Sequence, residues 1–357
     1  LIKPVNMKII RPILYLLLLL VGAFLLFLLY ATIDDYKPDE ISDQSIECEP
    51  DVLFDSLQLR LLIWNIGYAG LDASMDFFYD GGERMRPGRE GVMANLEGIT
   101  GTLAPYRDYD FVLLQEVDQD SKRSYHQNED QLIQDLFKGY HSSFGKNYDV
   151  GFVPIPLTEP MGKVKSGLMT LSKHCPLSVE RHSFPGNYSW PMNLFMLDRC
   201  FLASRFKLDN QKELVVINTH NSAYDDGSLR AQQMNHLSDY LLSEYEKGNY
   251  VIVGGDWNQT PFGLEPELPS HRFDTKDLIY IEKDYPAPGW HWAYDPGMPT
   301  NRRVAFPYDK STSLTTIIDC YLLSPNIELK HVETIDLDFK YSDHQPVQLE
   351  LRLSKNQ

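Results

Sequence analysis

Polar residues suited to binding a cation or a phosphate follow several apolar runs of this sequence. LLIWN ends at Asn65, VLLQE at Glu116 and VVINTH at His220, and VIVGGDWN carries Asp256 and Asn258. Carboxylate and amide oxygens are ligands that suit Mg²⁺ or Mn²⁺ better than Zn²⁺. If these runs are strands that end at one edge of a fold, the polar groups build a hydrolytic metal site there.

Three further polar residues come late in the chain. TIID ends at Asp319, and YSDHQPV carries Asp343 and His344 just before the last apolar run. A histidine among carboxylates is suited to general acid–base catalysis near neutral pH. Taken singly, such residues are often turn formers or structural histidines, so the functional interpretation depends on their joint order along the chain.

The apolar runs have the length and composition of β-strands. They cover residues 57–66, 110–117, 166–172, 200–206, 213–220, 250–256, 316–323 and 346–353. Helical spacing of apolar residues predicts helices at 92–103, 132–136 and 234–245, and long surface loops are expected over 259–312. Because many strands are apolar on both faces, helices must cover one side and a second sheet the other. The sequence therefore predicts a layered α/β sandwich.

An uncharged apolar run, ILYLLLLLVGAFLLFLLYATI, occupies residues 13–33. About 20 such residues cross a bilayer as a helix. Three cations precede the run and two acids follow it, so the positive-inside rule predicts a cytoplasmic N-terminus, residues 1–12, and an outward-facing domain. A cleaved secretory signal is the alternative, but its apolar core would span only about 7–15 residues and end in a small-residue cleavage site. An uncleaved signal anchor is favoured.

The acidic stretch 34–56 contains two prolines and lacks periodicity, so it is expected to link the membrane segment to a domain over residues 57–357. No internal repeat and no second-domain linker follow it.

Four cysteines allow two disulfides in three connectivities. Cys320 lies in the apolar run IIDCYLLS and is expected to be a buried thiol. Cys175 and Cys200 flank neighbouring strand candidates and are the pair to test first, while Cys48 lies in the acidic linker.

The formal net charge of the chain is −17, from 50 acidic and 33 basic residues. Such a surface repels a phosphate backbone, which argues against passive, high-affinity binding of nucleic acid. It is compatible with an enzyme whose bound cation supplies positive charge locally. The charged cluster of Asp118, Asp120, Lys122 and Arg123 is interpreted as a solvated surface run.

In their order along the chain, the segments WN, LLQEV, SGLMTLS, NTH, GGDWN, IID and SDHQPV resemble the motifs of the endonuclease/exonuclease/phosphatase superfamily of metal-dependent phosphoesterases. The resemblance runs from Leu57 to the C-terminus. It implies a four-layer α/β/β/α sandwich of two packed mixed sheets. In one departure, Gly67 stands where abasic-site nucleases of the superfamily carry an aspartate, and this weakens a DNA-repair interpretation.

The resemblance also implies roles for the metal and water ligands. Glu116 would be the principal ligand of Mg²⁺, or of Mn²⁺, with Asn65 and Asp343 completing the metal site. Asp256 would orient or deprotonate the attacking water, and Asn258 would donate a hydrogen bond to the charge that develops on the phosphate.

The two histidines take the remaining roles that the resemblance implies. His344 would be a second general acid or base, with Asp319 fixing its tautomer. His220 would contact the phosphate or protonate the leaving oxygen.

The sequence thus predicts a membrane-anchored, divalent-metal-dependent phosphoesterase that acts outside the cytoplasm. The expected substrate is a phosphoester: a lipid head group, a nucleotide, a sugar phosphate or nucleic acid. No obligate protein partner is evident. An extracytoplasmic nuclease and a non-catalytic module that binds a phospho-ligand are the alternatives, although a pure binding module needs no pair of histidines beside a base.

Overall fold

The computed structural model describes residues 7–54, 57–264 and 278–354. Its α-helices are α1 (Met7–Asp34), α2 (Arg89–Leu103), α3 (Glu129–Leu136) and α4 (Ser228–Glu246). Its short 3₁₀ helices are η1 (Gly67–Ala69), η2 (Phe78–Asp80), η3 (Ala104–Tyr106), η4 (Lys122–Ser124) and η5 (Met192–Phe195). Strands of the larger sheet are β1 (Ile41–Asp43), β2 (Val52–Leu53), β7 (Ser178–Ser183), β8 (Cys200–Leu208), β9 (Glu213–His220), β10 (Tyr250–Asp256), β11 (His291–Ala293) and β14 (Asp319–Leu323). Strands of the smaller sheet are β3 (Gln58–Asn65), β4 (Phe111–Asp118), β5 (His141–Val153), β6 (Gly162–Ser172), β15 (Ile327–Thr334) and β16 (Val347–Leu353). A separate pair is formed by β12 (Asn301–Arg302) and β13 (Thr315–Thr316).

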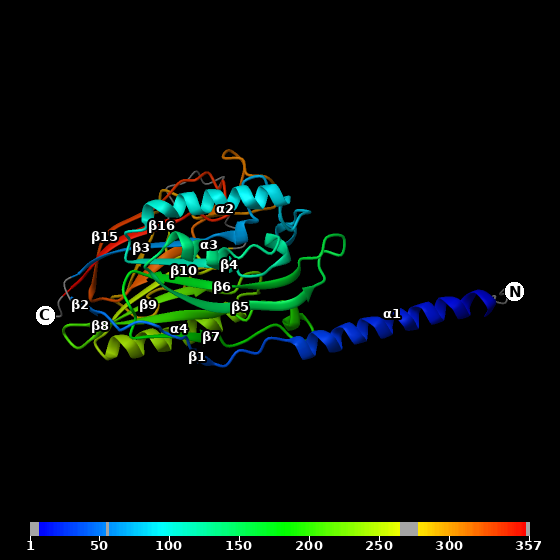
Figure 1. The fold of residues 1–357 in the computed structure, drawn as a ribbon, viewed down its shortest axis with the longest axis horizontal. Coiled ribbons are helices and arrows are strands. Elements are labelled where there is room, and N and C mark those ends of the chain that lie inside the picture. Colours follow the sequence, from blue (N-terminus) through cyan, green and yellow to red (C-terminus); the bar gives the residue numbers. More distant parts are fainter. Residues whose placement is uncertain (1–6, 55–56, 265–277, 355–357) are drawn as a thin grey trace.

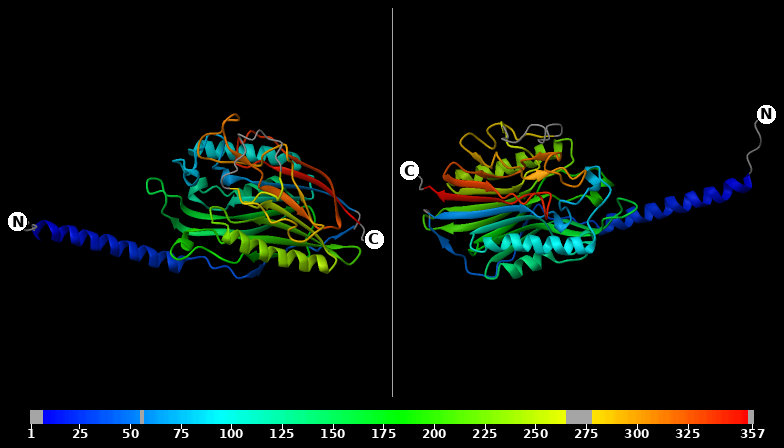
Figure 2. Two further views of the ribbon diagram at one scale, coloured as in Figure 1. Left: turned by 180° about the vertical axis from the view of Figure 1, so that it is seen from behind. Right: turned by 90° about the horizontal axis from the view of Figure 1, so that it is seen from above.

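The two sheets pack face to face, and helices cover their outer faces (Figures 1 and 2). The larger sheet has the order β1-β7-β8-β9-β10-β14-β11, with β2 beside β8. The smaller sheet has the order β15-β16-β3-β4-β6-β5. Both sheets contain parallel and antiparallel neighbours. The four-layer α/β/β/α sandwich of two mixed sheets predicted from the sequence is confirmed.

Alternation along β3 explains why the sheets are covered on both faces. Leu59, Leu61 and Ile63 belong to the core between the two sheets. Leu62 and Trp64 point the other way and belong to the core under α2 and α3. Successive side chains of a strand point to opposite faces, so a strand that is apolar at every position must be buried twice.

Each sheet contains a parallel strand pair whose crossover includes a helix. β3 is parallel to β4 with α2 between them in the chain, and β9 is parallel to β10 with α4 between them. Parallel strands end at the same edge of a sheet. Consequently Asn65 lies opposite Gln115 in one sheet and His220 opposite Asp256 in the other.

Each predicted strand and helix is present, with boundaries shifted by a few residues. The sequence did not predict β5, β7 and β15, nor the short strands within the expected loops. Part of that loop prediction, residues 265–277, lies outside the described residues.

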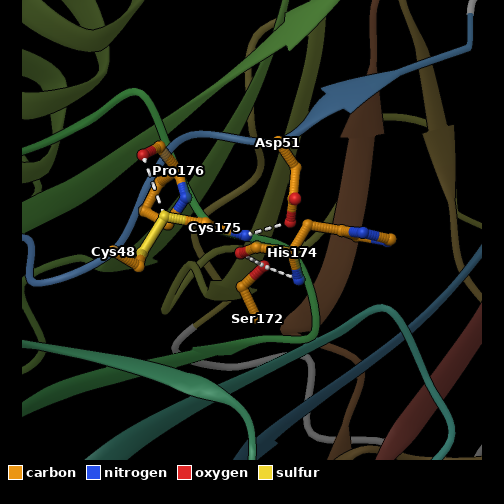
Figure 3. Close-up of a disulfide and its surroundings, with 6 residues drawn as sticks. All are labelled: Cys48, Asp51, Ser172, His174, Cys175 and Pro176. Carbon is orange, nitrogen blue, oxygen red and sulfur yellow. Dashed lines mark hydrogen bonds between the residues drawn. A yellow bond between two sulfur atoms is a disulfide. The ribbon is translucent and has the colours of Figure 1, made fainter.

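The acidic segment between α1 and β3 is attached to the domain for much of its length. β1 pairs with β7 and β2 pairs with β8, so this segment adds two short strands to the larger sheet. A disulfide joins Cys48 to Cys175 across 127 residues (Figure 3). Beside it, the Cys175 N–H donates to Asp51 Oδ2 at 2.7 Å.

The expected pairing of Cys175 with Cys200 is therefore wrong. Cys200 is a buried free thiol that packs with Leu168, Val179 and Leu202. Cys320 is also buried and free, as predicted. The acidic segment folds back against the domain and brings Cys48 to Cys175, which no spacing rule reveals.

The apolar run forms helix α1, which is long and apolar enough to cross a membrane. The window Arg11–Asp34 has a mean hydropathy of 2.8, and nearly all of it is exposed. Length and composition alone do not distinguish an anchor from a signal sequence. Leu28 and Ala31, near the end of the helix, are buried against the domain.

We expect the disulfide to stabilise the domain by restricting the unfolded chain. Replacing Cys48 by serine should lower the free energy of unfolding by about 2–5 kcal/mol. Thermal unfolding of the detergent-solubilised chain, with and without dithiothreitol, measures this. The reductant should lower the melting temperature of the wild type and leave that of Cys48→Ser unchanged. Equal melting temperatures of wild type and variant under oxidising conditions would contradict the prediction.

Candidate active site

Asn65, the last residue of β3, joins the two sheets at the edge where the parallel strands β3, β4, β9 and β10 end. Its Nδ2 donates to Asp256 Oδ2 at 3.0 Å and to Glu116 Oε1 at 3.3 Å. Its Oδ1 accepts the backbone N–H of Gly67 at 3.0 Å, which fixes the orientation of the amide. A Cβ on Gly67 would lie 3.0 Å from Asp343 Oδ1, and this residue has a φ of 53°, so glycine suits the position.

Glu116 lies at a bulge in β4. The register between β4 and β6 shifts between Leu114 and Val117, and Glu116 has a φ of 54°. A bulge redirects a side chain, and a positive φ at a residue with a Cβ costs energy that functional sites often carry. The redirected carboxylate lines a cavity, with Oε1 4.0 Å from Nε2 of His220.

The interpretation of the cluster around residues 118–123 as a solvated run is wrong for two of its members. Asp118 and Arg123 are buried, because β4 extends to Asp118. Arg123 donates from Nη2 to Asp118 Oδ1 at 2.9 Å and from Nε to Oδ2 at 3.2 Å. The guanidinium also lies over the ring of Tyr68 and 3.9 Å from Glu116 Oε2. A fixed cation therefore stands beside the Glu116 carboxylate.

His220 and Asp256 end the parallel strands β9 and β10. The Nε2 atom of His220 lies 3.4 Å from Asp256 Oδ2. Burial, together with the nearby Arg199 guanidinium, holds the pKa of His220 well below its usual value, so this histidine is neutral. Asp256 Oδ1 accepts the backbone N–H of Asn258 at 2.9 Å. Asn258 Nδ2 in turn donates to the Asn221 carbonyl at 3.0 Å.

His344 faces Asp319, the first residue of β14, with Nδ1 2.8 Å from Oδ2. Its Nε2 lies 3.0 Å from Asn301 Nδ2 and 3.8 Å from Asp256 Oδ2. Because Asn301 Oδ1 accepts from Thr316 at 3.1 Å, the amide nitrogen donates to Nε2 and the Nδ1 proton points to Asp319. Burial lowers the pKa of His344, but the surrounding carboxylates outweigh burial and raise it well above its usual value.

These residues surround one cavity of about 880 Å³. Six of the eight residues singled out from the sequence line it: Glu116, His220, Asp256, Asn258, Asp343 and His344. Asn65 and Asp319 lie directly behind this lining, hydrogen-bonded to Asp256 and His344 respectively. The structure therefore brings all eight residues together.

The donor set fits a divalent cation. Burial is the main reason that the pKa of Asp343 is raised to about 7; His344 opposes this rise and the charge of Glu116 adds to it. A cation between two such carboxylates would relieve their repulsion, and oxygen donors suit Mg²⁺ or Mn²⁺. In addition, ligand atoms of Asp256, Asp319 and His344 lie within 4.8 Å of one another.

Sequence reasoning missed several residues of the site. Arg199, just before β8, lines the cavity, and its buried Nη1 has no hydrogen-bond partner among the described residues. Asn301, which contacts His344, comes from a stretch expected to be loop. Beneath the site, Gln115 Nε2 donates to Asn218 Oδ1 at 2.7 Å and so links the two sheets. The predicted strands contained Gln115 and Asn218, but nothing in their spacing showed that they meet.

The profile of the Endonuclease/Exonuclease/phosphatase family matches residues 62–308, more than half of the chain. Among curated proteins there is no match. A solved endonuclease/exonuclease/phosphatase from Beutenbergia cavernae is 19% identical, with a TM-score of 0.59, over 83% of this chain and 72% of that one. One from Bacteroides vulgatus is 15% identical, with a TM-score of 0.52, over 84% and 100%. ANGEL2, a 2′,3′-cyclic phosphatase, is 16% identical, with a TM-score of 0.52, over 85% and 97%. At these identities the likeness concerns the fold.

The backbone of Gly255 lies against that of Thr219, and this close contact positions the neighbouring Asp256. We expect a side chain at Gly255 to disturb the position of Asp256. A Cβ there would lie 2.0 Å from the Thr219 carbonyl oxygen. Gly255→Ala should lower the free energy of unfolding by about 2–4 kcal/mol, from overpacking and the φ of 148°. Urea unfolding followed by tryptophan fluorescence measures the change.

The matched control is Gly101→Ala, on the exposed face of α2, where a Cβ would contact nothing. It should be neutral or stabilise the chain by up to about 1 kcal/mol, since alanine favours a helix. Equal effects of the two substitutions would refute the role given to Gly255.

Proposed function

The chain belongs to the endonuclease/exonuclease/phosphatase family, and from that premise we propose that it is a divalent-metal-dependent phosphoester hydrolase. Members of this superfamily are typically phosphoester hydrolases. We further propose that α1 is an uncleaved membrane anchor and that the catalytic domain faces away from the cytoplasm, as the charges around the apolar run indicate.

The observation that carries the proposal is the convergence of Glu116, Asp256 and His344 at one cavity, from both sheets. A structural role would not require a bulge at Glu116, a buried histidine–carboxylate pair of His344 and Asp319, and several carboxylates at a single edge. Unfavourable arrangements of this kind persist where chemistry depends on them.

Glu116 and Asp343 are the residues we assign to a divalent cation, with Asn65 holding the Glu116 carboxylate in place. When bound, such a cation would neutralise phosphate charge and polarise a phosphate oxygen. Arg199 and the neutral His220 line the same cavity and would donate hydrogen bonds to phosphate oxygens.

Asp256 and His344 are assigned to the attacking water. Their Oδ2 and Nε2 atoms lie 3.8 Å apart, so one water molecule can contact both. Asp319 fixes the His344 ring and stabilises its protonated form. Asn258 would donate a hydrogen bond to the charge that develops at phosphorus in the transition state.

We expect Glu116→Gln to abolish turnover while leaving the fold intact. Loss of the carboxylate should lower kcat for bis-p-nitrophenyl phosphate at least about 100-fold, the scale for removing one electrostatic group from a transition state. Glu97→Gln, an exposed site on α2, is the control and should keep full activity. Excess EDTA should have the same effect as the substitution, reversed by Mg²⁺ or Mn²⁺. Undiminished hydrolysis in EDTA would refute the mechanism.

Arg199→Gln tests the assigned phosphate contact. Because hydrogen bonds to charged groups contribute about 1.5–3 kcal/mol, kcat/KM should fall about 10- to 150-fold. Arg352→Gln, at an exposed position of β16, should change nothing. Steady-state kinetics on the soluble diester, with thermal unfolding to verify the fold, provide the measurement. A variant with wild-type kcat/KM would remove Arg199 from the site.

A further inference from the structure

The 3₁₀ helix η5 contacts α1, and residues within and next to η5 line the cavity. Phe195 of η5 stacks on Phe27 of α1, with ring centroids 5.7 Å apart. Phe152, near the end of β5, meets the same Phe27 ring edge-on at 6.1 Å. Met192 and Met196, within and just after η5, line the cavity. The segment around η5 therefore contacts α1 and also lines the cavity.

Several large apolar side chains near η5 and in the β5–β6 connection are exposed to solvent. Leu157, in the β5–β6 connection, is 87% exposed, and Trp190, just before η5, is 60% exposed. Ile155 and Met192 are exposed nearby in the chain. Trp190 Nε1 donates to Thr32 Oγ1 at 3.3 Å, which places its indole beside α1. Exposed apolar groups gathered in one region mark a surface that another apolar phase covers.

The position of α1 indicates that the apolar phase is a lipid bilayer. Its side chains are exposed along most of the helix, and contact with the domain is confined to its last turns, around Phe27 and Ala31. A bilayer that covers the helix must end where the domain begins. The loop between β5 and β6 leaves the same end of the domain as α1 (Figures 1 and 2). An indole with one polar edge, such as that of Trp190, favours the interface of a bilayer.

We propose that Leu157, Trp190 and Met192 form a membrane-docking surface on the bilayer that holds α1, and that the substrate is a phosphodiester lipid of that bilayer. The inference rests on the proposed function and adds the substrate class to it. The lining of the cavity has a matching mixed character, because charged groups such as Arg199 and apolar groups such as Met161 both line it.

The reaction on such a lipid is a hydrolysis that needs only water as co-reactant. The water oxygen forms a bond to phosphorus and the P–O bond to one alcohol breaks. The water proton is transferred through the site to the departing alkoxide. The products are one phosphomonoester and one alcohol.

Leu157→Asp separates docking from chemistry, because Leu157 does not line the cavity. The full chain is reconstituted into vesicles of phosphatidylcholine, phosphatidylethanolamine and phosphatidylglycerol, and lipid products are measured by mass spectrometry. The variant should hydrolyse lipid at least about tenfold more slowly, since a charge replaces an inserted apolar group. Its rate on soluble bis-p-nitrophenyl phosphate should equal that of the wild type. Phe54→Asp, at a 66% exposed position next to β2, should change neither rate.

The outcomes distinguish the two proposals. A wild type that hydrolyses neither the soluble diester nor lipid overturns the proposed function. A wild type that hydrolyses the soluble diester but none of the lipids overturns the substrate class alone. Leu157→Asp with unchanged lipid turnover, or with an equal loss on both substrates, overturns the docking surface.

A second measurement tests docking without any turnover. Cys200 and Cys320 are buried and Cys48 is in the disulfide, so a bimane label on Leu157→Cys reports this position. In vesicles the label should shift to shorter wavelength and be quenched by doxyl-labelled phosphatidylcholine, whereas a label on Phe54→Cys should not. If doxyl lipid does not quench the label at position 157, and its emission changes instead with the density of protein in the vesicles, the surface contacts a second copy of the chain. That result would overturn the proposal.

Discussion

One hydrogen bond between the sheets, from Asn65 Nδ2 to Asp256 Oδ2, joins the two halves of the site. Its two residues end strands of different sheets, so the bond forms only where the sandwich closes tightly at one edge. Glycines make that closure possible: a Cβ on Gly254 would lie 2.8 Å from Ile63 of the facing sheet. The buried pair of Gln115 and Asn218 makes a second link between the sheets beneath it. Buried polar bridges of this kind fix the register of two packed layers as well as stabilising them.

This tight edge is also a place where negative charge gathers away from water. Glu116, Asp256 and Asp343 line one cavity, and the cation nearest to Glu116 is committed to another partner, because Arg123 binds Asp118 in a two-pronged ion pair. An excess of buried carboxylates destabilises a fold unless a cation compensates it. A cation bound as proposed would offset this cost, and a local loss of stability of this kind is the usual character of a functional site.

Periodicity predicted the core strands because their burial on both faces leaves an apolar run in the sequence, and several of these runs, such as β3 and β9, ended at a polar residue of the site. It could not predict β5, whose run HSSFGKNYDVGFV mixes polar and apolar residues at a half-exposed edge of the sheet. The sequence did not predict Arg199 and Asn301 as site residues, for a different reason. Arg199 lies in an irregular segment and Asn301 in the two-residue strand β12, and neither is long enough to show a period that relates position to direction. The partner of Cys175 was equally hidden, since Cys48 reaches it only through the strand pairs that fold the acidic segment back.

The charge of the chain adds a constraint on how the domain meets a membrane. The chain has a net charge of −17, so anionic lipid repels it rather than attracting it, and this repulsion acts over about 8 Å at physiological ionic strength. Under the proposal, two features would offset the repulsion: the covalently attached α1 would keep the domain at high local concentration, and exposed apolar groups such as Leu157 and Trp190 need no charge to insert. An acidic enzyme with neither feature would meet a lipid surface only rarely. In the proposed arrangement, α1 and the exposed apolar groups would therefore act together to bring the cavity to a lipid substrate.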